Sequence, residues 1–212
     1  VYSEEIIALK MQNYPFVLLD RHLPGVETNV VLSDPALGSI LAVDHLWELG
    51  HRNIAICSDS PIPTVTVDER IQGYNEALKN KGAMINPALI LTDFSIPTGP
   101  SRTDHPLYRF LKSRMATAFI ALNCKLGVNL WSMAKELGLE VPGDLSIVTF
   151  DNPSPMLKEL SVFTYIDQSE EEMGREAASL LLDILEGNIK DVKYTKRIFK
   201  PRLVIHHTTG PV

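Results

Sequence analysis

Hydrophobic and polar positions follow two different periods that alternate along the whole chain. Short apolar runs without a helical period predict strands, and runs such as residues 16–19 are typical of strands that are covered on both faces. Between these runs, apolar residues recur every three or four positions and predict helices. The predicted strands are residues 16–19, 53–57, 89–91, 116–122, 145–150, 162–166, 194–199 and 202–206.

The predicted helices have start and stop signals that support this division. Asp34 and Pro35 suit the first positions of a helix, and Gly50 suits its end. Further helices are predicted near residues 4–12, 67–82, 107–111, 126–138 and 169–187. Alternating strands and helices predict an α/β fold with parallel sheets and helices on both faces. The last two strands, 194–199 and 202–206, are expected to pair with each other.

Polar side chains follow nearly every predicted strand. Ligands of parallel α/β sheets bind beyond the carboxyl ends of the strands, so these residues are the first candidates for a site. Carboxylates, amides and hydroxyls at such an edge suit a ligand rich in hydroxyl groups. The alternative for each residue alone is that it caps the following helix. The candidates are Asp20, Arg21, His22, Ser58, Asp59, Ser60, Asp93, Phe94, Asn123, Asp151, Asn152, Asp167 and Gln168.

Composition narrows the class of protein. A chain of 212 residues with 45% hydrophobic and 22% charged residues is typical of a globular protein of one or two small lobes. No apolar run reaches the roughly 18 residues of a transmembrane helix, so no membrane partner is expected. The net charge is −6, and the basic residues between 193 and 202 alternate with apolar ones. That alternation favours a solvated strand edge over a nucleic-acid groove.

The sequence lacks the usual motifs of catalysis and of cofactor binding. No pair of glycines has the GxG spacing of a dinucleotide site, and the P-loop spacing of Gly138 and Gly143 is followed by Asp144 where lysine is required. Two distant cysteines, Cys57 and Cys124, indicate neither a disulfide framework nor a metal site, and they favour a reducing cytoplasm. We therefore expect no enzyme, no cofactor and no metal.

Several segments, taken in order, resemble one known family. They are Phe16 to Arg21, Pro24-Gly25, His45-Leu46, the Gly-His-Arg-Asn-Ile-Ala run at 50–55, Arg70-x-x-Gly73-Tyr74, Thr117-Ala118 with Asn123, the Val-Pro-Gly-Asp-Leu-Ser run at 141–146, Phe150-Asp151-Asn152 and Pro201-Arg202-Leu203-Val204. This series is similar to the effector-binding core of LacI/GalR-type transcription regulators and covers essentially the whole chain. Cys124 departs from the pattern, because the family usually has an aspartate there.

The resemblance implies a periplasmic-binding-protein-like fold of two doubly wound parallel-sheet lobes, with the effector in the cleft between them. It assigns residues 1–58 and 152–165 to an N-terminal lobe that is incomplete here, and residues 59–151 and 166–212 to the C-terminal lobe. The reverse assignment of the short crossover segments stays open. A DNA-binding head would lie outside this chain.

The same resemblance implies five ligand-binding residues. Asp20 and Asp151 would accept hydroxyl hydrogens, Arg70 would donate hydrogen bonds, Phe94 would stack on a sugar ring, and Asn123 would contribute its amide. Each has a structural alternative. Arg70 would instead pair with Asp68 or Glu69 on a helix surface, Phe94 would belong to the core, and Asn123 and Asp151 would cap helices.

These inferences predict the effector-sensing and dimerisation core of a sugar-responsive transcription regulator, most simply a cytoplasmic repressor. Its partners would be a small-molecule effector, an operator DNA bound through the head, and a second copy of the chain. The helix at 126–137 with Trp131 is the predicted dimer face, and core packing is the alternative for Trp131. The rival functions are an extracytoplasmic sugar-binding receptor of the same fold and an enzyme.

Overall fold

The computed structural model describes residues 3–59, 64–92, 94, 104–153, 161–188 and 194–212, and these form two compact units. The small unit comprises Val1–Asp34 with Gln168–Pro201, and the large unit comprises Pro35–Asp167 with Arg202–Val212. This division differs from the expected lobes of residues 1–58 with 152–165 and 59–151 with 166–212. The difference has two sources: β3 (Ile54–Cys57) and β7 (Thr164–Asp167) pair within the sheet of the large unit, and residues 168–201 belong to the small unit.

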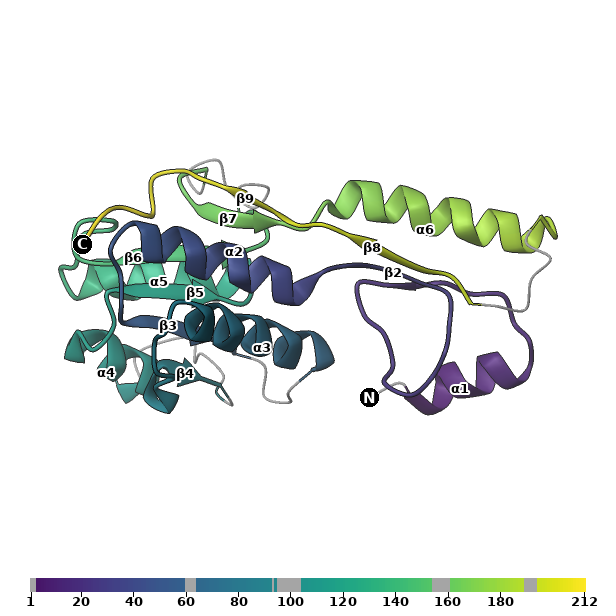
Figure 1. Ribbon diagram of the computed structural model, residues 1–212, viewed down its shortest axis with the longest axis horizontal. Helices are drawn as coiled ribbons and strands as arrows, with labels where there is room; N and C mark the ends of the chain where they lie inside the picture. Colours follow the sequence, from purple (N-terminus) through teal and green to yellow (C-terminus); the bar gives the residue numbers. More distant parts are fainter. Residues whose placement is uncertain (1–2, 60–63, 93, 95–103, 154–160, 189–193) are drawn as a thin grey trace. The chain divides into compact units, whose positions relative to one another are not determined.

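The large unit is built on a twisted sheet that is parallel except for one edge strand (Figure 1). Among the described residues its strand order is β4-β3-β5-β6-β7-β9. The further strands are β4 (Ile90–Leu91), β5 (Ala118–Ala121), β6 (Ser146–Phe150) and β9 (Arg202–Val204). All neighbours are parallel except β9, which runs antiparallel to β7 with Leu203 opposite Ile166. The predicted α/β class with parallel sheets is therefore confirmed.

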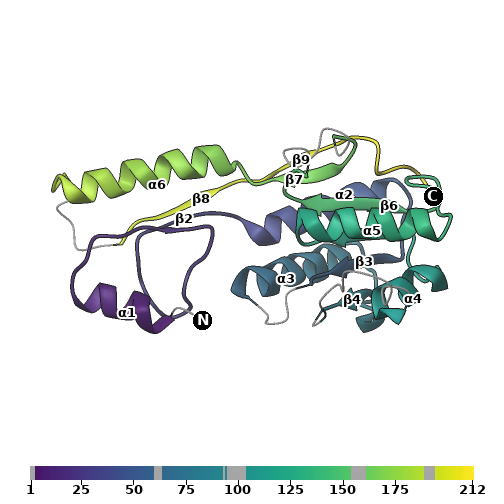
Figure 2. The same cartoon turned by 180° about the vertical axis from the view of Figure 1, so that it is seen from behind.

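Helices cover both faces of this larger sheet, as the continuous apolar strands predict (Figure 2). Ile54 and Ile56 of β3 pack in one cluster with α2 (Pro35–Glu48) and α3 (Val65–Asn80). The alternate residues Ala55 and Cys57 pack in a second cluster with α4 (Pro106–Ser113) and α5 (Cys124–Glu136). A short 3₁₀ turn, η1 (Pro87–Leu89), precedes β4. Successive side chains of one strand thus serve two separate cores.

Helices α2 and α3 approach each other closely at one glycine. A Cβ atom on Gly73 of α3 would lie 2.2 Å from the carbonyl oxygen of Ala36 in α2. No side chain fits at that distance, so glycine at position 73 allows the contact between the two helix backbones. Arg70 lies one turn earlier on the same helix.

The C-terminal residues are bound to the amino end of the larger sheet by a buried polar network. His51 is 2% exposed, its Nε2 lies 3.0 Å from the Gly210 carbonyl oxygen, and its Nδ1 lies 2.9 Å from Oγ1 of Thr117. Because a carbonyl only accepts, Nε2 carries the proton and Nδ1 accepts from the threonine hydroxyl. Ser146 at the start of β6 lies 3.0 Å from the same Nε2. Desolvation in this site lowers the pKa of His51.

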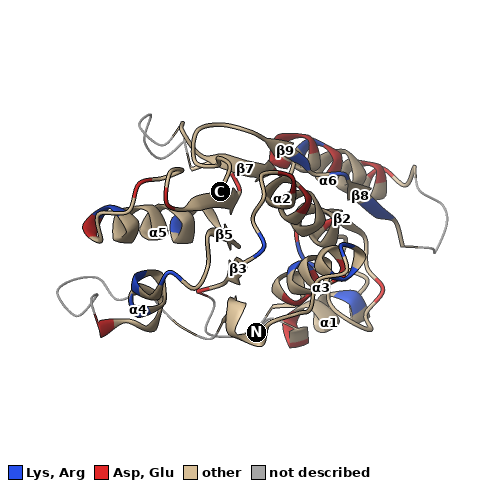
Figure 3. Cartoon of the chain, turned by 60° about the vertical axis from the view of Figure 1, so that its left-hand side comes forward, with Lys and Arg blue, Asp and Glu red and all other residues tan. Residues whose placement is uncertain are grey.

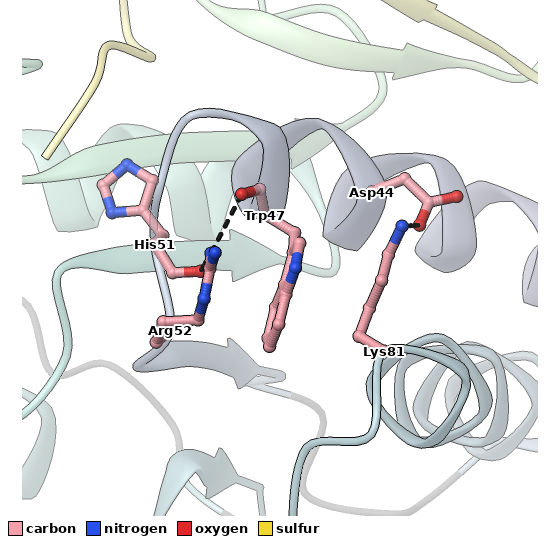
Figure 4. A network of polar contacts seen from close by, with 5 residues as sticks. All are labelled: Asp44, Trp47, His51, Arg52 and Lys81. Carbon is pink, nitrogen blue, oxygen red and sulfur yellow. Dashed lines mark hydrogen bonds and ion pairs between the residues drawn. The ribbon is translucent and has the colours of Figure 1, made fainter.

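Charged residues of α2, of the loop after it and of the end of α3 lie beside this network (Figure 4). The guanidinium of Arg52 lies 4.0 Å over the Trp47 ring and donates to the Trp47 carbonyl at 2.9 Å. One turn before Trp47, Asp44 pairs with Lys81 at 2.8 Å. Such exposed pairs contribute only about 0–1 kcal/mol, so they make suitable positions for control substitutions.

The small unit contains a three-stranded parallel sheet in the order β1-β2-β8, as far as its residues are described. The strands are β1 (Leu18–Leu19), β2 (Val30–Ser33) and β8 (Lys196–Phe199), and the helices are α1 (Ser3–Met11) and α6 (Glu170–Leu185). Val31 of β2 is fully buried in one cluster with Met173 and Leu180 of α6. Helix α6 therefore provides the core of this smaller sheet.

The expected pairing of the last two strands is wrong. Strand β8 pairs with β2 in the smaller sheet, and β9 pairs with β7 in the larger sheet. Lys200 and Pro201 separate the two strands, so the chain passes from one unit to the other at this point. Of the basic stretch, Lys196 and Arg197 lie on β8, which is an edge strand among the described residues, and Arg202 lies on β9 (Figure 3). Arg197 pairs with Glu176 of the acidic helix α6 at 3.3 Å.

Candidate functional site

Polar residues that follow β3, β5 and β6 meet at the carboxyl edge of the larger sheet. These three strands are adjacent and parallel, with Cys57 opposite Ala121 and Ala121 opposite Thr149. Asp59, Asn123 and Asp151 come one or two residues after the respective strand ends. The register therefore brings three side chains of very different sequence position to one edge.

Arg70 reaches this edge from α3 and is buried. It is 7% exposed, so the alternative of an ion pair on the helix surface does not describe its position. Its Nη1 donates to the carbonyl oxygen of Leu122 at 2.7 Å, and its guanidinium lies 4.0 Å over the ring of Phe150. The carbonyl and the aromatic face hold the planar group between the ends of β5 and β6.

Asn123 has the capping role that was its structural alternative, and it also makes a second contact. Its Oδ1 accepts from the backbone N–H of Leu126 at 2.8 Å and so caps α5. Its Nδ2 donates to Oδ1 of Asp59 at 2.7 Å. Both side chains are half-buried. One residue thus caps α5 and fixes a carboxylate at the end of the neighbouring strand.

Asp151 and Asp20 share an unusual backbone conformation at a strand end. Their φ angles are 65° and 66°, in the left-handed region that aspartate tolerates better than most residues. The N–H of Asp151 donates to the Ile166 carbonyl at 3.1 Å, and the N–H of Asp20 donates to the Val31 carbonyl at 2.9 Å. At each of these residues the N–H still donates a hydrogen bond to the neighbouring strand, and the chain then leaves the sheet. Strained conformations of this kind concentrate at functional sites.

Asp20 belongs to the small unit and the other four predicted site residues belong to the large unit. Asp20 follows β1 of the smaller sheet, as Asp151 follows β6 of the larger one. The small unit also has a hollow of about 370 Å³, lined by residues that include His22, Glu27, Tyr194 and Lys196. Asp20 does not line this hollow.

Phe94 follows the end of β4, the strand that pairs with β3. Its half-buried ring meets the ring of His105 edge to face at 5.3 Å and packs against the core cluster on the α4 and α5 side. Phe94 therefore makes contacts with the core, as expected if it has a structural rather than a ligand-binding role. The neighbouring candidates Ser60 and Asp93 lie outside the described residues.

Sequence reasoning found the strand-end positions but missed two of their contacts. Asp59 was one candidate among many, and nothing local indicates that it bonds to Asn123, 64 residues away. The stack of Arg70 on Phe150 was missed for the same reason. The alternation of strands and helices predicts that strand ends meet at one edge of a parallel sheet. Predicting these two contacts also requires the order and register of β3, β5 and β6, which the sequence does not give.

The side chains at this edge supply both donors and acceptors of hydrogen bonds. Asp59 and Asp151 supply acceptors, and Arg70 supplies donors. Among the described residues, no group of three or more His, Cys, Asp or Glu is placed to hold a metal ion. Burial beside Asp59 raises the pKa of the Cys57 thiol, which favours its protonated form.

Comparisons with known proteins identify the family to which this chain is similar. Residues 43–209 match the family model described as a periplasmic binding protein-like domain. The chain is 30% identical over 204 residues to the HTH-type transcriptional regulator DegA of Bacillus subtilis (strain 168), covering 95% of this chain and 58% of that protein. It is 32% identical over 196 residues to the HTH-type transcriptional repressor CytR of Escherichia coli (strain K12), covering 92% and 56%.

Among solved structures, a LacI family transcriptional regulator from Enterococcus faecium with bound ribose matches with a TM-score of 0.79 and 28% identity. The match covers 99% of this chain and 76% of that one. The chain spans a little more than half the length of the two curated relatives, at 58% and 56%. No helix in the described part of the chain is long and apolar enough to span a membrane.

Proposed function

Because the chain belongs to the periplasmic binding protein-like domain family, in the form of the effector-binding core of LacI-type transcription regulators, we propose that it binds a sugar or sugar derivative and passes the binding signal to DNA. The effector site includes the carboxyl edge of the larger sheet, with Arg70, Asn123 and Asp151 as contacts. Asp20 and Phe94 complete the proposed set.

The observation that carries this proposal is the buried position of Arg70. A guanidinium that is 7% exposed and held by a carbonyl and a ring has a fixed direction, so its donors are arranged before a ligand arrives. Asp151 lies directly after Phe150, on which Arg70 stacks. We therefore propose that one ligand hydroxyl accepts a hydrogen bond from Arg70 and donates one to Asp151, since a hydroxyl can do both.

The proposed signal is a linkage between ligand binding and DNA binding. A ligand that prefers one arrangement of the protein changes its affinity for DNA. DNA binding changes the affinity for the ligand by the same free energy. We propose a cytoplasmic homodimer that binds an operator through heads outside this chain, with repression as its action. The relatives named above are transcription regulators, which favours this role over that of an extracytoplasmic receptor.

Helix α5 is the proposed part of the dimer face. Trp131 on this helix is half-buried and meets the ring of Phe163 edge to face at 6.0 Å. This contact gives the indole a packing role within the large unit, and its remaining surface is available to a second copy. A Trp131→Ala variant should therefore lower both stability and dimer affinity, and the second effect separates the two roles.

A thermal-shift screen of neutral pentoses and hexoses tests the proposal. A ligand at a hundred times its Kd stabilises the fold by about 2.7 kcal/mol, which raises the Tm of a chain of this size by about 5–11 °C. Calorimetry on the strongest hit should then show at least a tenfold loss of affinity in Asp151→Asn, because hydrogen bonds to a charged group contribute about 1.5–3 kcal/mol.

Asparagine at position 151 tolerates the left-handed backbone, so this variant tests the carboxylate rather than the fold. Asp44→Asn removes the same charge from the α2 surface and should bind as the unmodified chain does. Equal affinities for Asp151→Asn and Asp44→Asn would remove Asp151 from the site. A screen in which no neutral sugar raises the Tm would count against the function itself.

A further inference from the structure

The carboxylate of Asp59 is held in place by Asn123 at the edge where Arg70 and Asp151 lie. Asp59 follows β3 and Asn123 follows β5, and these strands pair directly through Cys57 and Ala121. The 2.7 Å hydrogen bond from Nδ2 of Asn123 fixes the Oδ1 atom of Asp59. Asp59 is half-buried, so its carboxylate combines a fixed position with access to solvent.

The two side chains differ in how much hydrogen-bonding capacity they have left. The Oδ1 of Asn123 is taken by the N–H of Leu126, and one hydrogen of its Nδ2 is taken by Asp59. A carboxylate offers about four acceptor positions, and within the described part of the chain Asp59 receives the one hydrogen bond from Asn123. The acceptor capacity of this pair therefore belongs to Asp59.

We infer that Asp59 determines ligand specificity as an acceptor for a sugar hydroxyl, and that Asn123 acts mainly as a positioning residue for it. This inference rests on the proposed function, because it names a further contact of the same site. It also assigns the class of ligand. A neutral polyol with a hydroxyl near the end of β3 is bound, and the phosphate ester of the same sugar is rejected.

The balance of charge at this edge supports the rejection of anions. Asp59 and Asp151 contribute two carboxylates, and Arg70 contributes one guanidinium, one of whose donors is already used by the Leu122 carbonyl. At the end of β7, the carboxylate of Asp167 is paired with Arg202 at 2.9 Å. The net charge of these groups is negative, so a phosphoryl group would be repelled.

Exchanging the side chains of Asp59 and Asn123 separates an effect on ligand affinity from an effect on stability. Asp59→Asn keeps an oxygen that accepts from Asn123 but removes the charge. Asn123→Asp keeps the oxygen that caps α5 but sets two carboxylates against each other. The double variant, D59N with N123D, restores the hydrogen bond with the amide on position 59 and the carboxylate on position 123.

The experiment measures the Tm and the calorimetric Kd of the full-length protein that contains this chain, and of these variants, with d-ribose, d-glucose, ribose 5-phosphate and glucose 6-phosphate. We expect Asp59→Asn to weaken binding of the neutral sugar about tenfold or more and to narrow the gap between sugar and phosphate. The double variant should regain the Tm lost in Asn123→Asp without regaining the affinity. Asp44→Asn serves as the charge control, with an unchanged Kd.

Two results overturn the inference in different ways. If the unmodified chain binds a neutral sugar and Asp59→Asn or the double variant binds it equally well, Asp59 is only a partner of Asn123, while the proposed function stands. If none of the sugars raises the Tm of the unmodified chain, the proposed function fails and the role of Asp59 fails with it.

Discussion

Replacing Gly73 by alanine tests whether the close approach of α2 and α3 sets the geometry of the site. The added Cβ would lie 2.2 Å from the Ala36 carbonyl oxygen, whereas ordinary contacts begin at 3.4 Å. The two backbones must therefore separate by about 1.2 Å. Overpacking of a core costs about 1–3 kcal/mol, and the upper end applies here because backbone atoms cannot rotate away.

Alanine also stabilises a helix relative to glycine by about 0.5–1 kcal/mol. The net destabilisation is then about 2 kcal/mol, which lowers the Tm by about 4–8 °C for a chain of this size. Since Arg70 lies one turn from Gly73, its 2.7 Å contact with the Leu122 carbonyl should also be strained, and sugar affinity should fall.

Scanning calorimetry with and without ligand measures both effects. Gly174→Ala on α6 is the matched control, because a Cβ there meets nothing within 4 Å and the variant should be stabilised by about 0.5–1 kcal/mol. A Gly73→Ala variant that melts at or above the Tm of the unmodified chain would refute the argument from close approach.

Three further predictions concern the core and the assembly. Burial lowers the pKa of His51 below the unfolded value of 6.5, so its contribution to stability is present above pH 6.5 and is lost as the pH falls below it. Urea titrations at pH 7.5 and 5.5 should show that the free energy of unfolding differs less between the two pH values in His51→Gln than in the unmodified chain. Part of the difference should persist, because burial also lowers the pKa of His45. The same difference in both proteins would contradict this prediction. Tyr74→Phe removes a 2.8 Å hydrogen bond to the Ile54 carbonyl and should destabilise by about 1 kcal/mol in the same assay, and a variant as stable as the unmodified chain would show that this bond contributes nothing net. Light scattering at micromolar concentration should give the mass of a dimer for the full-length protein, and a monomer would count against the proposed coupling.

The candidate site shows where sequence reasoning reaches its limit. Polar residues after each strand were visible in the sequence, because the end of an apolar run marks the end of a strand. The burial of Arg70 was not visible in the sequence, because α3 has an exposed side and a buried side and only the packed structure shows on which side Arg70 lies. The bond between Asp59 and Asn123 depends on the pairing of β3 with β5.

The sequence by itself determined the α/β class, the presence of each helix with ends one or two residues from those observed, and the polar character of the strand ends, because these depend on neighbours a few residues apart. Only the tertiary structure decided that β8 joins β2 and that β9 joins β7, although two residues separate β8 from β9. It also decided which strand-end side chains meet. The physical reason is that strand pairing and register are set by burial over the whole sheet, which local patterns do not record.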